Sequence, residues 1–167
     1  MKIQVLKKRF TKDVLEKIIE IDKTFYHDFD FSETDWYFKR YNSKNIVYVL
    51  IINDEVVGYF NLLNISKKLF DDICALKYSQ DYSFPESDVN VNTNYVYMPS
   101  LVVKEEYRKY SICLILKLKE VVKKSKNFVV IAVSNEGKIL ASKCLNKIGN
   151  KKKATIFAKI DKKSSDN

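Results

Sequence analysis

The feature that most constrains this chain is the stretch "VVKEEYRKYSICLILKLKEVV", which runs from Val102 to Val122. Its apolar start is typical of a β-strand, its middle is a charged turn, and its end has apolar residues at helical spacing. Strand-turn-helix junctions of this kind hold phosphate groups in many proteins, usually through a glycine-rich loop. This stretch contains no glycine. Two interpretations therefore stand: a phosphate-binding turn that lacks glycines, or a plain connection between a strand and a helix.

The first forty residues predict a strand followed by two helices. "KIQVLKKRF" is typical of a β-strand. Asp13 and Glu16 are spaced as the two members of a capping box, so a helix should begin at Asp13. Ser32 and Asp35 have the spacing of a cap and the third helical residue, which predicts the start of a second helix.

The middle of the chain predicts a hairpin, a helix and a further strand. "NIVYVLIINDEVVGYFNLLNI" indicates two strands joined at Asn53-Asp54. Residues 66 to 93 indicate a helix around "KKLFDDICALKYS" and then a polar loop. "NYVYMPSLVV" predicts one more strand. The helix expected after it runs from residue 112 to 124, with apolar residues at positions 112, 115, 116, 118 and 122.

The last third predicts two strands with a helix between them. "NFVVIAV" is a continuous apolar run, which is typical of a strand covered on both faces. "NEGKILASKCLNKIG" predicts a helix that ends at Gly149, where a left-handed C-cap would belong. "ATIFAKI" predicts a closing strand. No long linker or repeat interrupts the order, so we expect one α/β domain over residues 1–160 and a frayed polar tail over 161–167.

Composition fits a single globular domain in a reducing compartment. A chain of 167 residues that is 46% hydrophobic can bury a core. Its apolar runs are short and broken by charges, so no membrane span is expected, and the N-terminus lacks the apolar core of a signal peptide. Cys74, Cys113 and Cys144 are far apart in the sequence, which favours free thiols over disulfides. We therefore expect a cytoplasmic protein.

The net charge of +9 suggests an anionic partner. Nucleic acid, an acidic protein surface or a phosphorylated cofactor would each fit. The lysines are dispersed, however, and only "KLKEVVKKSK" and "NKKKATIFAKIDKK" are dense runs. We therefore favour a solvated basic surface and do not expect a nucleic-acid partner.

The order of these elements, with three of their motifs, resembles the GNAT superfamily of acyl-CoA N-acyltransferases over nearly the whole chain. "NDEVVGYFNL" resembles the second and third strands of that family, where a glycine is common in the third. "SLVVKEEYRKYSIC" resembles the fourth strand and the acetyl-CoA turn, and "IAVSNEGKILASKCLNKIG" resembles the fifth strand and the helix after it. The resemblance implies an α/β (α+β), three-layer α-β-α domain. Its central sheet would be mixed, largely antiparallel, with six or seven strands, and the fourth and fifth strands would run parallel and then diverge.

The resemblance implies that an acetyl group passes directly from acetyl-CoA to an amine on a small molecule or a protein. In the family the pantetheine pairs with the fourth strand, and the pyrophosphate meets the turn that follows. Ser111 and Cys113 stand here where that turn has small residues, mostly glycine, and Glu105 stands in the place of a common proline. Asn135, after the fifth strand, could reach the pantetheine amides or simply cap a helix. The cofactor-binding residues implied are Leu101, Val102, Val103, Arg108, Lys109, Tyr110, Ser111, Ile112, Cys113 and Asn135.

The residues that would handle protons are less defined. Leu145 occupies the position of a family tyrosine that often protonates the leaving thiolate. Tyr97 is the candidate general base, although a tyrosine with the ordinary pKa of about 10 is a poor base and a water chain would serve as well. Tyr95 and Tyr97 on one strand face could equally be ordinary packing.

The acceptor and other partners are open. In the family the region between the first two helices lines the acceptor pocket, and here it would suit a cationic amine. The same acids could instead favour a helix N-terminus. No metal site is expected, and a homodimer is left open. The alternative function is a non-catalytic GNAT-like or basic module for an acidic or nucleic-acid partner. The acids of the acceptor region are Asp28, Asp30, Glu33 and Asp35.

Overall fold

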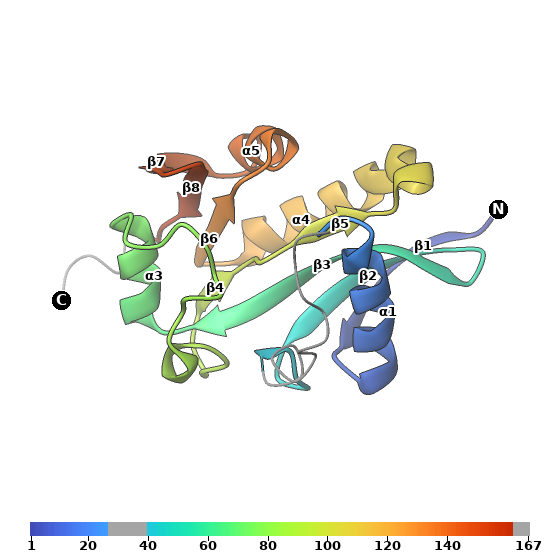
Figure 1. Ribbon diagram of the computed structural model, residues 1–167, viewed down its shortest axis with the longest axis horizontal. Helices are drawn as coiled ribbons and strands as arrows, with labels where there is room; N and C mark the ends of the chain where they lie inside the picture. The colour runs from blue at the N-terminus through green and yellow to red at the C-terminus, as the bar shows by residue number, and fades with distance from the viewer. Residues whose placement is uncertain (27–39, 162–167) are drawn as a thin grey trace. The chain divides into compact units, whose positions relative to one another are not determined.

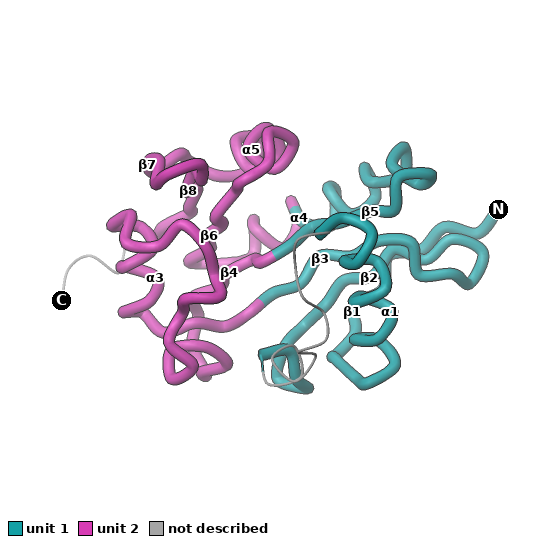
Figure 2. The backbone as a smooth tube through the Cα atoms, in the orientation of Figure 1, with its two compact units in different colours: residues 1–62, 100–118 teal, residues 63–99, 119–167 magenta. Residues whose placement is uncertain are grey.

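The computed structural model describes residues 1–26 and 40–161. Its chain divides into two compact units, one of residues 1–62 and 100–118 and the other of residues 63–99 and 119–167 (Figure 2). Hydrogen bonds link the strands in the order β1-β2-β3-β4-β6-β8-β7, and β5 pairs with β3 beside that path. The predicted start of a helix at Ser32 lies outside the described residues. Strand β3 and helix α4 contribute to both units, and each unit is described below by itself.

Unit 1 contains an antiparallel sheet in the order β1-β2-β3-β5. Side chains on both faces of β2 and β3 are buried, and Figure 1 shows α1 and α4 on opposite faces of this sheet. The layers expected from the sequence are therefore present here. The elements of this unit are β1 (Ile3–Arg9), α1 (Lys12–Lys23), β2 (Ile46–Ile52), β3 (Glu55–Ile65), β5 (Leu101–Val103), the 3₁₀ helix η2 (Glu105–Tyr110) and α4 (Ser111–Lys124).

Local sequence explains how the first elements of unit 1 begin and turn. Asn53 and Asp54 have φ values of 48° and 67°, and both residue types tolerate the left-handed conformation that a two-residue hairpin needs. The predicted hairpin is confirmed. The predicted start of α1 at Asp13 is wrong, because Thr11 is the cap and its hydroxyl accepts the amide of Val14 at 3.3 Å. Asp13 lies instead in the first turn, where its charge favours the helix dipole.

Unit 2 is built around β6, whose six residues are all buried. β6 pairs parallel with β4 and antiparallel with β8, and β8 pairs antiparallel with β7. This confirms the prediction of a strand covered on both faces for Asn127–Ala132, whereas Val133, the last residue of the predicted run "NFVVIAV", is 53% exposed. The elements of this unit are α3 (Lys67–Cys74), the 3₁₀ helix η1 (Glu86–Asp88), β4 (Tyr95–Tyr97), β6 (Asn127–Ala132), α5 (Asn135–Ser142), β7 (Asn146–Lys151) and β8 (Ala154–Lys159).

Two corrections raise the strand count of the described residues to eight. "NYVYMPSLVV" forms two strands, because β4 ends at Tyr97 and β5 begins at Leu101. The helix expected to reach Gly149 ends at Ser142, and Gly149 lies in strand β7 without a positive φ. It is not a C-cap. A Cβ at Gly149 would lie 2.8 Å from Leu76 Cδ1, so contact with that side chain explains the glycine better.

The buried stripe of α4 also differs from the expected one. Ile112 and Leu116 are 51% and 55% exposed, whereas Leu114, Leu118 and Val122 are buried. The first turns of this helix carry apolar residues on several faces, so the periodicity of the sequence does not identify the face that packs on the sheet. No helix of the described ranges is long and apolar enough to cross a membrane.

Candidate functional site

Strand β5 has a strand partner on one edge only. Its residues pair with β3 from Gly58 opposite Val103 to Phe60 opposite Leu101, and within residues 1–26 and 40–161 no strand pairs with its other edge. The parallel pairing of β4 with β6 ends at Tyr97 opposite Val129. β4 thus pairs with β6 over all three of its residues, whereas β5, the second part of the predicted strand, pairs with β3. An extended ligand could add to the second edge of β5 by main-chain hydrogen bonds.

The turn after β5 is helical throughout. The six residues of η2 lead directly into α4, and Ser111 has helical φ and ψ of −56° and −25°. The amide of Tyr107 donates to the carbonyl of Lys104 at 2.9 Å, and the amide of Ser111 donates to the carbonyl of Arg108. A chain without glycine takes this conformation without strain, because no residue of the turn needs a positive φ.

This geometry modifies the expected anion site without removing it. The Ser111 amide already has an acceptor, so an anion must displace that bond or bind the later amides, of which Ile112 and Cys113 come first. Ser111 and Cys113 are half-buried small side chains that leave room near the start of α4. The positive end of this 14-residue helix favours an anion at the same place.

Cationic side chains stand at the turn. Arg108 and Lys109 are exposed, and the Lys109 ammonium lies 5.0 Å from the centre of the Tyr110 ring. The Tyr110 hydroxyl contacts Met1 Sδ at 3.2 Å. These two positive charges belong to the contiguous segment 108–113, whereas the exposed acids Glu105 and Glu106 lie at the start of the same 3₁₀ helix.

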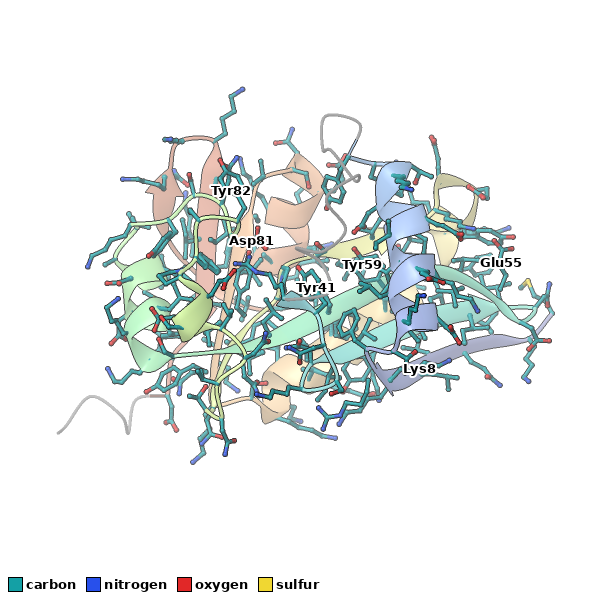
Figure 3. The ribbon with its side chains drawn as sticks, turned by 60° about the horizontal axis from the view of Figure 1, so that its bottom comes forward. Lys8, Tyr41, Glu55, Tyr59, Asp81 and Tyr82 are labelled. Carbon is teal, nitrogen blue, oxygen red and sulfur yellow. The ribbon has the colours of Figure 1, made fainter. Side chains whose placement is uncertain are left out.

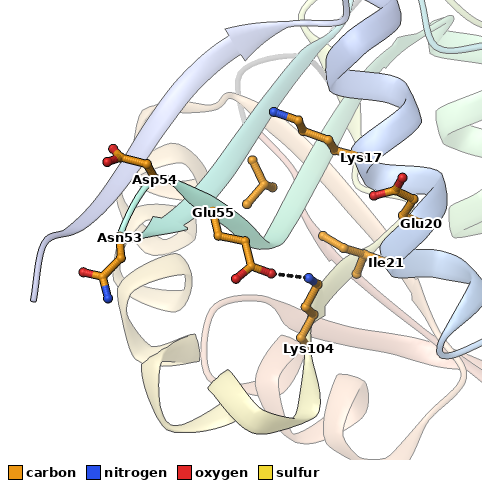
Figure 4. Close-up of a pocket in the computed structure, with 8 residues that line it drawn as sticks. Lys17, Glu20, Ile21, Asn53, Asp54, Glu55 and Lys104 are labelled. Carbon is orange, nitrogen blue, oxygen red and sulfur yellow. Dashed lines mark hydrogen bonds and ion pairs between the residues drawn. The ribbon is translucent and has the colours of Figure 1, made fainter.

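A carboxylate that the sequence analysis missed holds the start of this turn (Figure 4). The Lys104 ammonium donates to Glu55 Oε1 at 2.5 Å, and the Tyr107 hydroxyl donates to Glu55 Oε2 at 3.3 Å. The hydrogen bond from Lys104 lowers the pKa of Glu55 below its usual value, and the same bond raises the pKa of Lys104. Glu55 is distant from both partners in sequence, so no local pattern could have found it. Beside the contact lies a cavity of about 370 Å³, lined by Lys17, Glu20, Ile21, Asn53, Asp54, Glu55, Val56 and Lys104.

A buried acid-phenol pair lies elsewhere on the same strand. The Tyr59 hydroxyl donates to Asp22 Oδ1, and both side chains are almost fully buried between β3 and α1. Burial, with a further contribution from the charge of Asp22, raises the pKa of Tyr59 well above its ordinary value. Figure 3 shows Tyr59 beside α1, with Glu55 further along β3 toward the hairpin. Tyr59 therefore remains protonated at any physiological pH.

Tyr97 and Asn135, the remaining sequence-predicted residues, belong to unit 2. Tyr97 is 2% exposed at the end of β4, and its ring lies edge-on to Phe84 with centroids 5.1 Å apart. That environment fits the packing interpretation, and its role as a base stays a prediction. Asn135 is not the helix cap, because the Ser134 hydroxyl accepts the amide of Gly137 at 3.0 Å. Asn135 is exposed at the first position of α5, and its contact with the cofactor stays a prediction.

Two further expectations concerned the acceptor pocket and a metal site. The acidic residues expected at an acceptor pocket, Asp28, Asp30, Glu33 and Asp35, lie outside the described residues. In the part of the chain that is described, no group of three or more His, Cys, Asp or Glu side chains could hold a metal ion.

Solved structures share this fold. No known protein-family profile and no curated protein sequence matches the chain. The PaiA N-acetyltransferase of Thermoplasma acidophilum, solved with coenzyme A, is 13% identical with a TM-score of 0.56, over 96% of this chain and 99% of that one. The Arabidopsis thaliana protein NAA60, solved with acetyl-CoA, is 15% identical with a TM-score of 0.60, over 94% and 99%. A GNAT-family acetyltransferase of Staphylococcus aureus is 10% identical with a TM-score of 0.58, over 93% and 98%.

The chain therefore has the fold of the GNAT N-acetyltransferases. At these levels of identity the likeness establishes the arrangement of helices and strands, and activity has to be argued from the residues of the site.

Proposed function

We propose that this protein is an acetyl-CoA-dependent N-acetyltransferase that passes the acetyl group directly to an amine. The observation that carries the proposal is the second edge of β5, which no described strand occupies and which leads into a helix start with two exposed cations. An extended pantetheine amide chain and a pyrophosphate are the two parts of CoA that these features suit. The fold, which this chain shares with acetyltransferases solved with CoA or acetyl-CoA, supports the same proposal.

In this proposal the segments of unit 1 divide the work of binding. Main-chain groups of Leu101, Val102 and Val103 pair with the pantetheine, and residues 108–113 meet the pyrophosphate. Arg108 and Lys109 add charge that attracts the anion, and the small side chains of Ser111 and Cys113 allow a close approach. A β5 amide also donates to the thioester carbonyl oxygen, which stabilises the negative charge that develops there.

The chemistry needs one bond made, one broken and one net proton transfer. The amine nitrogen attacks the thioester carbonyl carbon, the new N–C bond forms, and the C–S bond then breaks to release CoA as a thiolate. The amine loses one proton and the thiolate takes one up, so the CoA product leaves as a thiol. We assign removal of the amine proton to Tyr97 or to water, and contact with the pantetheine amides to Asn135.

Further parts of the proposal concern the acceptor and the location. The acceptor is an amine, and the acids expected near it favour a cationic one. A reducing cytoplasm suits Cys74, Cys113 and Cys144, none of which forms a disulfide within the described residues. A homodimer is compatible with the proposal and is not needed for it.

The decisive experiment is a thermal melt of the protein with and without CoA or acetyl-CoA. Ligand at a hundred times its Kd stabilises a native state by about 2.7 kcal/mol. For a domain of this size that corresponds to a rise in Tm of roughly 5–10 °C. Ser111→Trp should abolish the rise, because the indole would fill the approach to the first turn of α4, whereas Ser111→Gly should preserve or enlarge it.

Leu116→Trp is the matched control. Leu116 is 55% exposed on the same helix, beyond the turn, so its substitution should leave the CoA effect intact. An unchanged Tm of the unmodified protein in millimolar CoA and acetyl-CoA would mean that the turn is only a connection. That outcome would favour the non-catalytic basic module.

A further inference from the structure

We propose that Glu55 is a positioning residue for the cofactor turn, acting as a clamp that fixes the direction in which the chain leaves β5. The inference rests on the proposed function, because it concerns the same turn. Glu55 is the first residue of β3, after the hairpin, and its two carboxylate oxygens reach two different residues of the turn. It does not itself lie among residues 108–113.

The contacts of Glu55 coincide with the first hydrogen bond of η2. The amide of Tyr107 donates to the carbonyl of Lys104 at 2.9 Å, and this closes the first turn of the 3₁₀ helix. The side chains of these same two residues are the ones that donate to Glu55. One carboxylate therefore ties both ends of the turn that decides where the rest of the helix points.

The turn needs such a clamp because it has no cap of its own. Lys104 precedes η2 and makes no side-chain capping bond, and six residues is long for a 3₁₀ helix. Main-chain contacts of β3 hold the preceding residues. The amide of Lys104 donates to the carbonyl of Val57 at 2.8 Å, and β5 passes so close to Gly58 that a Cβ there would lie 2.8 Å from the Val102 carbonyl oxygen. Glu55 extends this support from the end of β5 into the turn.

The direction in which Glu55→Gln changes the affinity for CoA distinguishes a clamp from simple electrostatic repulsion. A carboxylate near an anion site repels the anion, so on charge alone Glu55→Gln should bind CoA more tightly. If Glu55 orients the turn, the same substitution should bind CoA more weakly, because the amides and cations of residues 108–113 lose their alignment. Lys104→Met weakens binding in either case and does not discriminate by itself.

The test measures the Kd of CoA by calorimetry for these variants. Since a partly exposed ion pair contributes about 0.2–1 kcal/mol, we expect Glu55→Gln and Lys104→Met each to raise the Kd by up to about fivefold. The charge exchange Glu55→Lys with Lys104→Glu restores the ion pair but not an acceptor for the Tyr107 hydroxyl, so it should recover part of the lost affinity. Asp54→Asn is the matched control, because Asp54 is the neighbouring acid of the same cavity and is directed away from Lys104 (Figure 4). A Kd that falls in Glu55→Gln overturns the clamp.

A second measurement keeps the clamp distinct from the proposed function. Amide hydrogen exchange over residues 105–111, recorded without CoA, should become several-fold faster in Glu55→Gln and Lys104→Met and recover in part in the charge exchange. Exchange unchanged in both single variants overturns the clamp, whatever CoA does. Faster exchange in a protein that binds no CoA overturns the proposed function and, with it, the cofactor role of Glu55.

Discussion

The junction from β6 into α5 is closed by its own serine, whereas the junction from β5 into α4 has no such serine. In the first, the Ser134 hydroxyl accepts the amide of Gly137 and the Ser134 carbonyl accepts the amide of Lys138. In the second, Lys104 makes no side-chain cap, and the chain passes through a 3₁₀ helix before α4 begins. The same succession of strand, turn and helix is therefore built in two ways.

The difference shows which junction can serve a ligand. A side-chain cap accepts one of the first four amides of a helix, so a capped helix start has one amide fewer to offer an anion. Helices α1 and α3 are capped like α5, by Thr11 and Ser66. The lead-in of α4 has no such side-chain cap at Lys104, and it is held by Glu55, Val57 and Gly58 of β3 instead. External support leaves the turn itself open to a ligand.

The largest effect should come from disturbing that external support at Gly58. A Cβ at this position would lie 2.8 Å from the Val102 carbonyl oxygen and 2.9 Å from Val103 Cγ2, so β5 or β3 would have to move. We expect Gly58→Ala to lower the free energy of unfolding by about 1–3 kcal/mol, the usual cost of forcing atoms into a packed site. Urea unfolding followed by circular dichroism measures it.

Gly137→Ala is the control at the capped junction. Its Cβ would lie 3.0 Å from Ser134 Oγ, a side-chain atom that can rotate, and alanine in a helix gains up to about 1 kcal/mol over glycine. The cost of the close contact and the gain in helix propensity should nearly cancel, so the free energy of unfolding should change little. A loss at Gly137 as large as the loss at Gly58 would contradict the contrast between the two junctions.

An intermediate effect on the free energy of unfolding should distinguish Ser134, at the capped junction, from Ser111, at the other junction. Ser134→Ala removes a cap and should lower the free energy of unfolding by about 1 kcal/mol. Ser111→Ala should change the free energy of unfolding by only a few tenths of a kcal/mol in either direction, because Ser111 is already inside the helical turn and alanine is the better helix former. Equal losses in urea unfolding would show that Ser111 also acts as a cap, and would weaken the case for a ligand site there.

Much of this fold could be predicted because its signals are local. The left-handed residues of the hairpin, Asn53 and Asp54, and the continuous apolar run of β6 are read from adjacent residues. The start of α1 was misplaced because Thr11 and Asp13 are both good caps and only one of them accepts the third helical amide. The end of α5 was misplaced because glycine suits both a C-cap and a close contact, and the contact of Gly149 is with Leu76 of another element.

The site could be predicted only where it is contiguous. Residues 108–113 follow one another, so the sequence located the turn, but it did not show that the turn is a 3₁₀ helix with the Ser111 amide in use. Glu55 could not be found, because a carboxylate meets Lys104 and Tyr107 only once the strands have paired. Long-range pairs of this kind depend on which strands pair, and Glu55 and Lys104 lie 49 residues apart in the sequence.

The smallest effect should appear in the reactivity of the cysteines, one of which lies at the start of a helix and two at the ends of other helices. Cys113 lies in the first turn of α4, whereas Cys74 ends α3 and Cys144 follows α5. Saturating CoA should slow alkylation of Cys113 by iodoacetamide a few-fold, because the ligand partly covers a half-buried thiol, and should leave the other two rates unchanged. Mass spectrometry of the digested protein gives all three rates at once.

The dependence on pH supplies the internal check. Burial, and secondarily the charge of Asp71, raises the pKa of Cys74 to about 11, and burial also raises the pKa of Cys144. Only the thiolate reacts, so between pH 8 and pH 10 the alkylation rate of Cys74 should rise about tenfold per pH unit, with no plateau. The raised pKa also means that the folded state favours the protonated thiol of Cys74. The contribution of this thiol to the free energy of unfolding is complete below pH 9 and is lost as the pH rises toward 11. Protection of Cys74 by CoA at pH 8, equal to that of Cys113, would mean that the ligand tightens the whole fold, and it would remove the distinction between a ligand-bearing and a capped helix.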